Sequence, residues 1–140
     1  MKKRQYEMKN GQYITVNEML RSQTAEKLNI KNVPNDPIVI ENLEYTIEQL
    51  DELRRLYEHP IIITSGYRCP ALNKAVGGKP NSQHVKGQAA DIKYDPELLQ
   101  FIIDKFHYDQ LIEETSKRTK WIHISFNKEK ERMQYIKLKV

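Results

Sequence analysis

Two short stretches of the sequence carry residues whose types and spacing suit a metal ion. In the first stretch, His84 precedes Asp91 by seven residues, and a glycine and two alanines lie between them. In the second, His123 stands between two isoleucines. Two imidazoles and one carboxylate form a ligand set that catalytic zinc sites use, with the fourth position left to water. His84, Asp91 and His123 are therefore candidate ligands of a Zn²⁺ ion that would activate this water.

Each of these residues, taken singly, also has an ordinary explanation. A lone histidine in a strand is more often a satisfied core or surface residue than a ligand, and Asp91 could pair with a lysine or cap a turn. However, a carboxylate between Ala90 and Ile92 is costly to bury unless it is paired or binds a cation. By alternation along a strand, His123 and Trp121 share one face. Spacing alone leaves ligation and ordinary structural roles both open.

Length and composition predict one soluble globular domain. The chain has 140 residues, of which 39% are hydrophobic and 30% charged, enough to close a core of its own. Its one cysteine, Cys69, rules out an internal disulfide and a thiolate zinc cluster. No run approaches the roughly 18 apolar residues of a membrane span, and no pattern of aromatic and basic residues indicates nucleic-acid binding. We expect a monomer over residues 1–140, with residues 1–13 as a loosely ordered arm.

The first residues do not form a secretory signal, because no apolar stretch follows their basic residues. We expect synthesis in the cytoplasm of a bacterium or a phage-infected cell. The protein would then leave by another route, or a signal has been removed. The net charge of +4 mildly favours anionic partners such as a bacterial envelope, although an ordinary solvated surface explains it as well.

Hydrophobic periodicity predicts an α+β fold in which N-terminal helices pack on a mostly antiparallel sheet. A capping box at Thr15–Glu18 opens a helix that we expect to run to about Leu28, and a second helix spans about Ile38–Tyr57. Two further helices are expected from Cys69 to Gly77 and from Asp95 to Phe106. Apolar or alternating runs predict five strands, at residues 61–64, 89–93, 108–114, 121–126 and 134–140.

Several motifs together resemble one family of bacterial enzymes. The sequence is similar to the zinc D-alanyl-D-alanine carboxypeptidases and related murein endopeptidases, whose fold is shared with the hedgehog signalling domain. The resemblance covers about Ile14 to Phe126 and includes Thr64–Pro70, Leu72–Asn73, Val76–Gly78, Ser82–Asp91, Tyr108–Ile112 and Trp121–Ser125. Two earlier segments, Glu18–Ser22 and Asn32–Pro34, resemble the phage-associated branch of the family. The resemblance implies that His84, Asp91 and His123 are the metal ligands.

The resemblance also implies roles for residues around the metal. An arginine at the position of Arg68 stabilises the oxyanion that forms when water attacks a peptide carbonyl, and contacts substrate. Ser82 would either donate a hydrogen bond to the terminal carboxylate of the substrate or shape its loop. Trp121 is expected to pack or to form a wall of the substrate site. Asp109 could orient a ligand histidine or cap a turn. We expect Gln83 and Ser125 to be structural, and His59 and His107 not to be ligands.

At the position expected for the general base, the sequence departs from several members of the family that it resembles. They carry an acidic residue three positions before the last histidine, where this chain has Lys120. A hairpin at residues 115–119 should return the chain from Glu113 and Glu114 to the strand of His123. Because these two glutamates point to opposite faces, only one can serve. The phage-type and hedgehog-type branches have a glutamate five residues after the position of Asp109, so we favour Glu114, with Glu113 as the alternative.

The resulting hypothesis is a zinc metallopeptidase that hydrolyses peptidoglycan stem peptides at the bacterial cell wall. The resemblance does not distinguish a D-Ala-D-Ala carboxypeptidase from a murein endopeptidase. A second hypothesis is a non-catalytic zinc-containing module that binds the cell wall or a protein, which the lysine at position 120 supports. A third is a purely structural metal domain. A fourth protein ligand beside the three would favour the structural site, whereas an open position would favour the enzyme.

Overall fold

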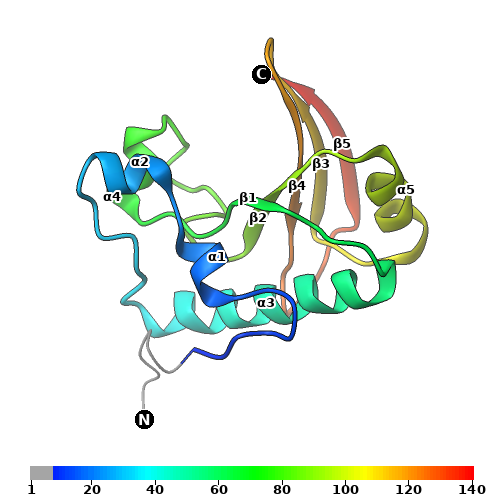
Figure 1. Ribbon diagram of the computed structural model, residues 1–140, viewed down its shortest axis with the longest axis horizontal. Coiled ribbons are helices and arrows are strands. Elements are labelled where there is room, and N and C mark those ends of the chain that lie inside the picture. Colours follow the sequence, from blue (N-terminus) through cyan, green and yellow to red (C-terminus); the bar gives the residue numbers. More distant parts are fainter. Residues whose placement is uncertain (1–7) are drawn as a thin grey trace.

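The computed structural model describes residues 8–140, which form an α+β fold around one mixed five-stranded sheet (Figure 1). The helices are α1 (Val16–Leu20), α2 (Gln23–Lys27), α3 (Pro37–Tyr57), α4 (Pro70–Ala75) and α5 (Pro96–Lys105). The strands are β1 (Ile63–Ser65), β2 (Ala89–Lys93), β3 (Gln110–Thr115), β4 (Lys120–Ser125) and β5 (Gln134–Lys139). The predicted fold class is confirmed.

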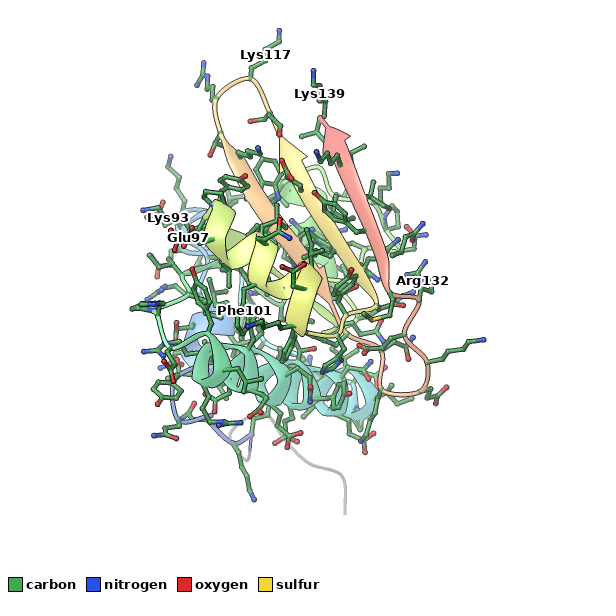
Figure 2. All side chains as sticks on the ribbon, turned by 90° about the vertical axis from the view of Figure 1, so that its right-hand side faces the viewer. Lys93, Glu97, Phe101, Lys117, Arg132 and Lys139 are labelled. Atoms are coloured by element: carbon green, nitrogen blue, oxygen red, sulfur yellow. The ribbon has the colours of Figure 1, made fainter. Side chains whose placement is uncertain are left out.

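The sheet has the strand order β1-β2-β4-β3-β5. Its first three neighbouring pairs are antiparallel, and only β3 and β5 are parallel. Cross-strand partners share a face, so the register divides the sheet into an apolar face and a polar face. The apolar face carries residues that are completely buried: Ala90, Ile92, Leu111, Ile122 and Ile124. Helix α5 lies across the sheet in Figure 2, and α3 runs along its lower end in both views.

Helix α3 is the longest element and matches the predicted helix closely. Asp36 caps its N-terminus by accepting a hydrogen bond from the Ile38 amide, and Pro37 fits the first turn, where no amide donor is needed. Its buried stripe includes Leu43, Ile47, Leu50 and Leu53. None of the helices within residues 8–140 is long and apolar enough to cross a membrane.

The predicted first helix is wrong in one respect, because two short helices replace it. The capping box is present: Thr15 accepts from the Glu18 amide, and the Glu18 carboxylate accepts from the Thr15 amide. The chain then becomes extended at Arg21, and Ser22 caps α2 by accepting from the Ala25 amide. Ser22 satisfies the amides of a new helix start instead of continuing the old helix, which the apolar periodicity could not reveal.

Residues 8–13 lie against α3, whereas residues 1–7 of the expected N-terminal arm fall outside the described part of the chain. Met8 is buried, and the amides of Tyr13 and Ile14 both donate to the carboxylate of Asp51 on α3. This part of the segment is therefore anchored.

Strand β5 forms one edge of the sheet and packs less tightly than its alternating sequence suggests. Ile136 and Leu138 share the polar face with their partners Ile112 and Glu114. However, Leu138 is 44% exposed, and Val140, which follows the end of β5, is 63% exposed. The apolar side chains of β5 thus border the polar face instead of entering the core.

Candidate metal centre

The polar face of the sheet brings the three candidate ligands together. Asp91 and His123 are direct cross-strand partners on β2 and β4, and His84 approaches them from the loop before β2. The Asp91 Oδ1 atom lies 3.2 Å from His84 Nε2 and 3.1 Å from His123 Nδ1. One potential ligand atom from each residue lies within 4.8 Å of the other two. These three residues could therefore hold one metal ion.

The histidine protons show why this group fits a cation. His84 Nδ1 lies 2.7 Å from the carbonyl oxygen of Gly66. A carbonyl only accepts, so this nitrogen must carry a proton. In neutral His84, Nε2 then presents a lone pair toward the negatively charged oxygen of Asp91. Two facing acceptors repel each other unless a cation lies between them. Two nitrogens and one carboxylate oxygen are a donor set that zinc takes.

The electrostatic surroundings of Asp91 favour its ionised form. Burial raises the pKa of Asp91, but the neighbouring His84 and His123 outweigh burial and lower it. The two imidazole rings are nearly enclosed, with His84 3% and His123 7% exposed. Because the rings are shielded from water, their electrostatic interactions with a bound ion are stronger than they would be at an exposed site.

Helix α3 holds the loop that carries His84. The hydroxyl of Thr46 donates to the Gly87 carbonyl at 2.8 Å, and the side-chain amide of Asn42 donates to the Lys86 carbonyl at 3.0 Å. Gly87 has a φ of +77°, and a Cβ there would lie 2.7 Å from the Val39 carbonyl oxygen. Only glycine permits both this backbone conformation and this close approach to α3.

A hollow of about 630 Å³ opens over the three ligands. The other four predicted site residues, Arg68, Ser82, Glu114 and Trp121, all line it. The segment after β4 contributes to the lining as well, with Asn127, Arg132 and Leu138. The structure therefore brings every predicted site residue to the same cavity.

The β3–β4 hairpin separates the two candidate bases onto opposite faces. Glu114 pairs with Trp121 on the polar face, next to the metal group. Burial, followed by the charge of Asp91, raises the pKa of Glu114. Glu113 faces the other way, where it accepts from Lys120 at 2.7 Å and from Tyr135 at 2.9 Å. Lys120 therefore neutralises Glu113 away from the ligands, and only Glu114 shares their cavity.

Arg68 is half-buried beside the centre. Its Nη2 donates to the Ser82 hydroxyl at 3.2 Å, and this same hydroxyl accepts from the His84 amide at 3.2 Å. Burial lowers the pKa of the guanidinium, and the charges of Asp91 and Glu114 oppose that effect. An arginine keeps its charge under such a shift. Ser82 thus shapes the loop and holds Arg68 in place.

Three polar residues support the site although their types gave little reason to single them out. Asn32 is buried and holds the segment of Arg68: it donates to the Tyr67 carbonyl at 2.9 Å and accepts from the Cys69 amide at 2.7 Å. Thr46 supports the His84 loop, and Gln83 contacts His123 at 2.9 Å. Neutral side chains lack the charge and spacing signals of ligands. For Asn32, the sequence signal is the resemblance of the segment Asn32–Pro34 to the family.

The remaining histidines lie away from the centre, as expected. His107 contacts Glu131 and, at 2.7 Å, Gln49. His59 packs edge-on against Tyr57. Within residues 8–140, the group that could hold a metal ion consists of three residues, and no further His, Cys, Asp or Glu joins it. This favours an open fourth position over a closed structural site.

Comparison with known proteins adds an independent observation. A family model described as peptidase M15 matches residues 12–125, which include all the residues assigned to the centre. The match ends at the end of β4, before the segment that contains β5. No curated protein matches the chain significantly.

Proposed function

The chain belongs to the peptidase M15 family, and we propose that it is a zinc metallopeptidase that hydrolyses peptidoglycan stem peptides. It would act at the cell wall, as a D-Ala-D-Ala carboxypeptidase or as a murein endopeptidase. The observation that carries this proposal is the three-residue metal group at the base of an open hollow that it shares with Glu114 and Arg68.

Glu114 is the proposed general base. A zinc ion, when bound, supplies a Lewis acid that polarises the scissile carbonyl and acidifies a water molecule. Glu114 would accept the proton of the attacking water and pass it to the leaving amine. Its half-buried carboxyl has a raised pKa, which makes it a better proton acceptor than an ordinary glutamate. Glu113 lacks access to this cavity and is already paired with Lys120.

Arg68 is the proposed electrostatic partner of the transition state. Its guanidinium lines the hollow over the metal group and is held by Ser82. A fixed cation there would stabilise the oxyanion that develops on the attacked carbonyl. Ser82 would act mainly through Arg68, and its hydroxyl also borders the space available to a substrate carboxylate.

The cavities around Arg68 suit an extended anionic peptide. Besides the hollow over the metal group, a second one of about 600 Å³ has Arg21 and Arg68 in its lining. A peptide that crosses Arg68 would reach both cavities. Lys79 and Lys86 add positive charge around the first hollow, which complements the free carboxylates of stem peptides. Trp121 would form an apolar wall beside the scissile bond.

Digestion of purified muropeptides tests the proposal. The zinc-loaded protein should release fragments that mass spectrometry identifies, and these fragments also reveal which bond is cut. A chelator should abolish the release, and added zinc should restore it. Intact muropeptides after incubation with a protein shown to contain zinc would contradict the enzyme and favour a binding module.

A further inference from the structure

Gln83 links the metal ligand His123 to a charged pair outside the metal group. Its Oε1 atom lies 2.9 Å from His123 Nε2, and its Nε2 atom lies 3.3 Å from a carboxylate oxygen of Asp109. Asp109 is in turn held by Arg132. The four side chains form a chain of contacts that starts at the ring nitrogen facing away from the metal position.

Arg132 fixes both the place and the charge of Asp109. Its Nη2 donates to Oδ2 at 2.7 Å, while its Nε and its backbone amide donate to Oδ1 at 3.0 and 2.9 Å. The hydrogen bond from Arg132 is the main reason that the pKa of Asp109 is lowered. Asp109 is 4% exposed, so it is a buried carboxylate that remains ionised and can only accept hydrogen bonds.

The charge of Asp109 determines which way the Gln83 amide faces. Only the NH₂ group of Gln83 can donate to a carboxylate, so its carbonyl oxygen must face His123. That oxygen accepts, and therefore His123 must carry its proton on Nε2. Neutral His123 then presents the lone pair of Nδ1 to the metal position. With the reversed amide, the proton would lie on Nδ1 and block the ligand atom.

We propose that Gln83 is a positioning residue that keeps Nδ1 of His123 free for the metal, with its own amide oriented by Asp109 and Arg132. The proposal rests on the metal site of the proposed function, but not on its substrate. Partners that fix the outer nitrogen of a ligand histidine commonly contribute to metal affinity. For His84, the Gly66 carbonyl does this directly. For His123, the Gln83 side chain accepts the proton of the outer nitrogen, and the charge of Asp109 sets the orientation of the Gln83 amide.

Arg132, which holds Asp109, lies outside the part of the chain that the family model matches. Arg132 lies in the loop that leads into β5, at the opposite end of the sheet from Lys117 at the hairpin tip (Figure 2). Its side chain is 54% exposed, whereas that of Asp109 is 5% exposed. The segment after residue 125 therefore contributes to the metal centre through Asp109 and Gln83.

Metal affinity of the purified protein tests the proposal without any substrate. Zinc competition with a chromogenic chelator should show that Gln83→Met, which keeps the length of the side chain but cannot hydrogen-bond the ring, binds about 10- to 100-fold more weakly. The matched control is Gln134→Met, which replaces an exposed glutamine whose side chain hydrogen-bonds Gln110 and not His123. The control should bind zinc as the unchanged protein does.

The protonation of His123 gives a second readout that a merely structural role would not move. ¹⁵N–¹H NMR spectra of the zinc-loaded protein should show the Nε2–H signal of His123, because the Gln83 oxygen accepts this proton. In Gln83→Met the proton loses its acceptor, so it should exchange faster with water and its signal should weaken. Should Gln83→Met fail to fold, Arg132→Gln changes only a largely exposed side chain and should shift both readouts in the same direction.

Zinc affinity equal to that of the unchanged protein, together with an unchanged Nε2–H signal in Gln83→Met, would overturn the proposal. Its failure is distinct from failure of the proposed function. A protein that binds zinc through His123 but leaves muropeptides intact contradicts the enzyme, and the role of Gln83 would still stand. If the protein cleaves muropeptides and Gln83→Met binds zinc as tightly as the unchanged protein, the proposed function stands and the role of Gln83 is contradicted.

Discussion

At the scale of single residues, the decisive property of the centre is where each proton lies. The outer nitrogens of His84 and His123 face oxygen acceptors, Gly66 and Gln83. Both inner nitrogens then face Asp91 as lone pairs. This arrangement is unfavourable without a positive charge and favourable around a cation, which explains why a largely buried carboxylate is tolerated on a strand of small and apolar residues.

Glu114→Gln tests the assignment of the general base. The variant keeps the size of the side chain but cannot take a proton, so kcat for muropeptide cleavage should fall by about 10²- to 10⁴-fold. Zinc content, measured by mass spectrometry of the metal, should stay at one ion per chain. Glu113→Gln is the matched control, since Glu113 faces the opposite side of the sheet. Equal losses in the two variants would remove the assignment.

The raised pKa of Glu114 also predicts how the metal-free protein responds to pH. In the folded chain, burial favours the neutral carboxyl. Between the ordinary pKa of glutamate and this raised value, the folded state binds more protons than the unfolded state, so stability falls as pH rises. Glu114→Gln should therefore unfold at higher urea concentration than the unchanged metal-free protein at pH 7. The two should converge at low pH, and a variant that is less stable at pH 7 would contradict this.

Arg68→Ala should separate catalysis from metal binding. Removal of a cation beside the developing oxyanion should lower kcat by roughly 10²- to 10³-fold. The zinc ligands themselves remain, so zinc content should be unchanged. Arg118→Ala, at the exposed tip of the β3–β4 hairpin, is the control. Loss of zinc in Arg68→Ala would show that Arg68 supports the ligands instead.

The sequence predicts the charged members of the site well, and the neutral ones poorly. His84, Asp91 and His123 stand out because their types and positions are unusual for a strand or loop. Gln83 lies beside His84 in the same motif, yet its role depends on Asp109, which is 26 residues away in the sequence. A neutral amide becomes informative only when its partners are known.

At the scale of elements, the docking of helix α3 on the His84 loop matters most. Periodicity predicts α3 as a scaffold with an apolar stripe, and that is confirmed. However, Thr46 and Asn42 also hold the loop through its backbone carbonyls. Such contacts cannot be read from periodicity, since they depend on which loop lies beside the helix. The break between α1 and α2 at Ser22 is a similar local effect.

Thr46→Val should weaken both the fold and the metal site. Valine keeps the shape of threonine but leaves the buried Gly87 carbonyl without its donor, which costs about 1–3 kcal/mol. Urea denaturation should show this loss, and zinc affinity should fall because the loop of His84 is less fixed. Thr119→Val, at an exposed position of the hairpin, should change neither quantity. A Thr46→Val protein with unchanged stability would contradict the proposed docking.

At the scale of the whole molecule, the sheet gathers segments that are distant in the sequence. The His84 loop, β2, β3, β4 and the segment before β5 all border one hollow. Alternation predicts the strands and their faces. The parallel pairing of β5 beside β3 was not predicted, because it depends on how the chain after residue 126 crosses the end of the sheet. That crossing brings Arg132 to Asp109.

Because the metal group joins these segments, zinc should stabilise the entire fold. A ligand that binds only the folded state adds about 2.7 kcal/mol at a free concentration 100 times its Kd. Thermal unfolding followed by circular dichroism should show a higher Tm with zinc than with a chelator. His123→Ala should lose this difference. A zinc-dependent shift that survives in His123→Ala would place the ion elsewhere.

The most direct measurement is anomalous diffraction at the zinc edge from crystals grown with zinc. We predict one strong peak between His84 Nε2, the Asp91 carboxylate and His123 Nδ1, at about 2.0–2.2 Å from each ligand atom. Water should occupy the fourth position on the side of the hollow. A peak at another place, or a fourth protein ligand that closes the site, would contradict a catalytic zinc centre.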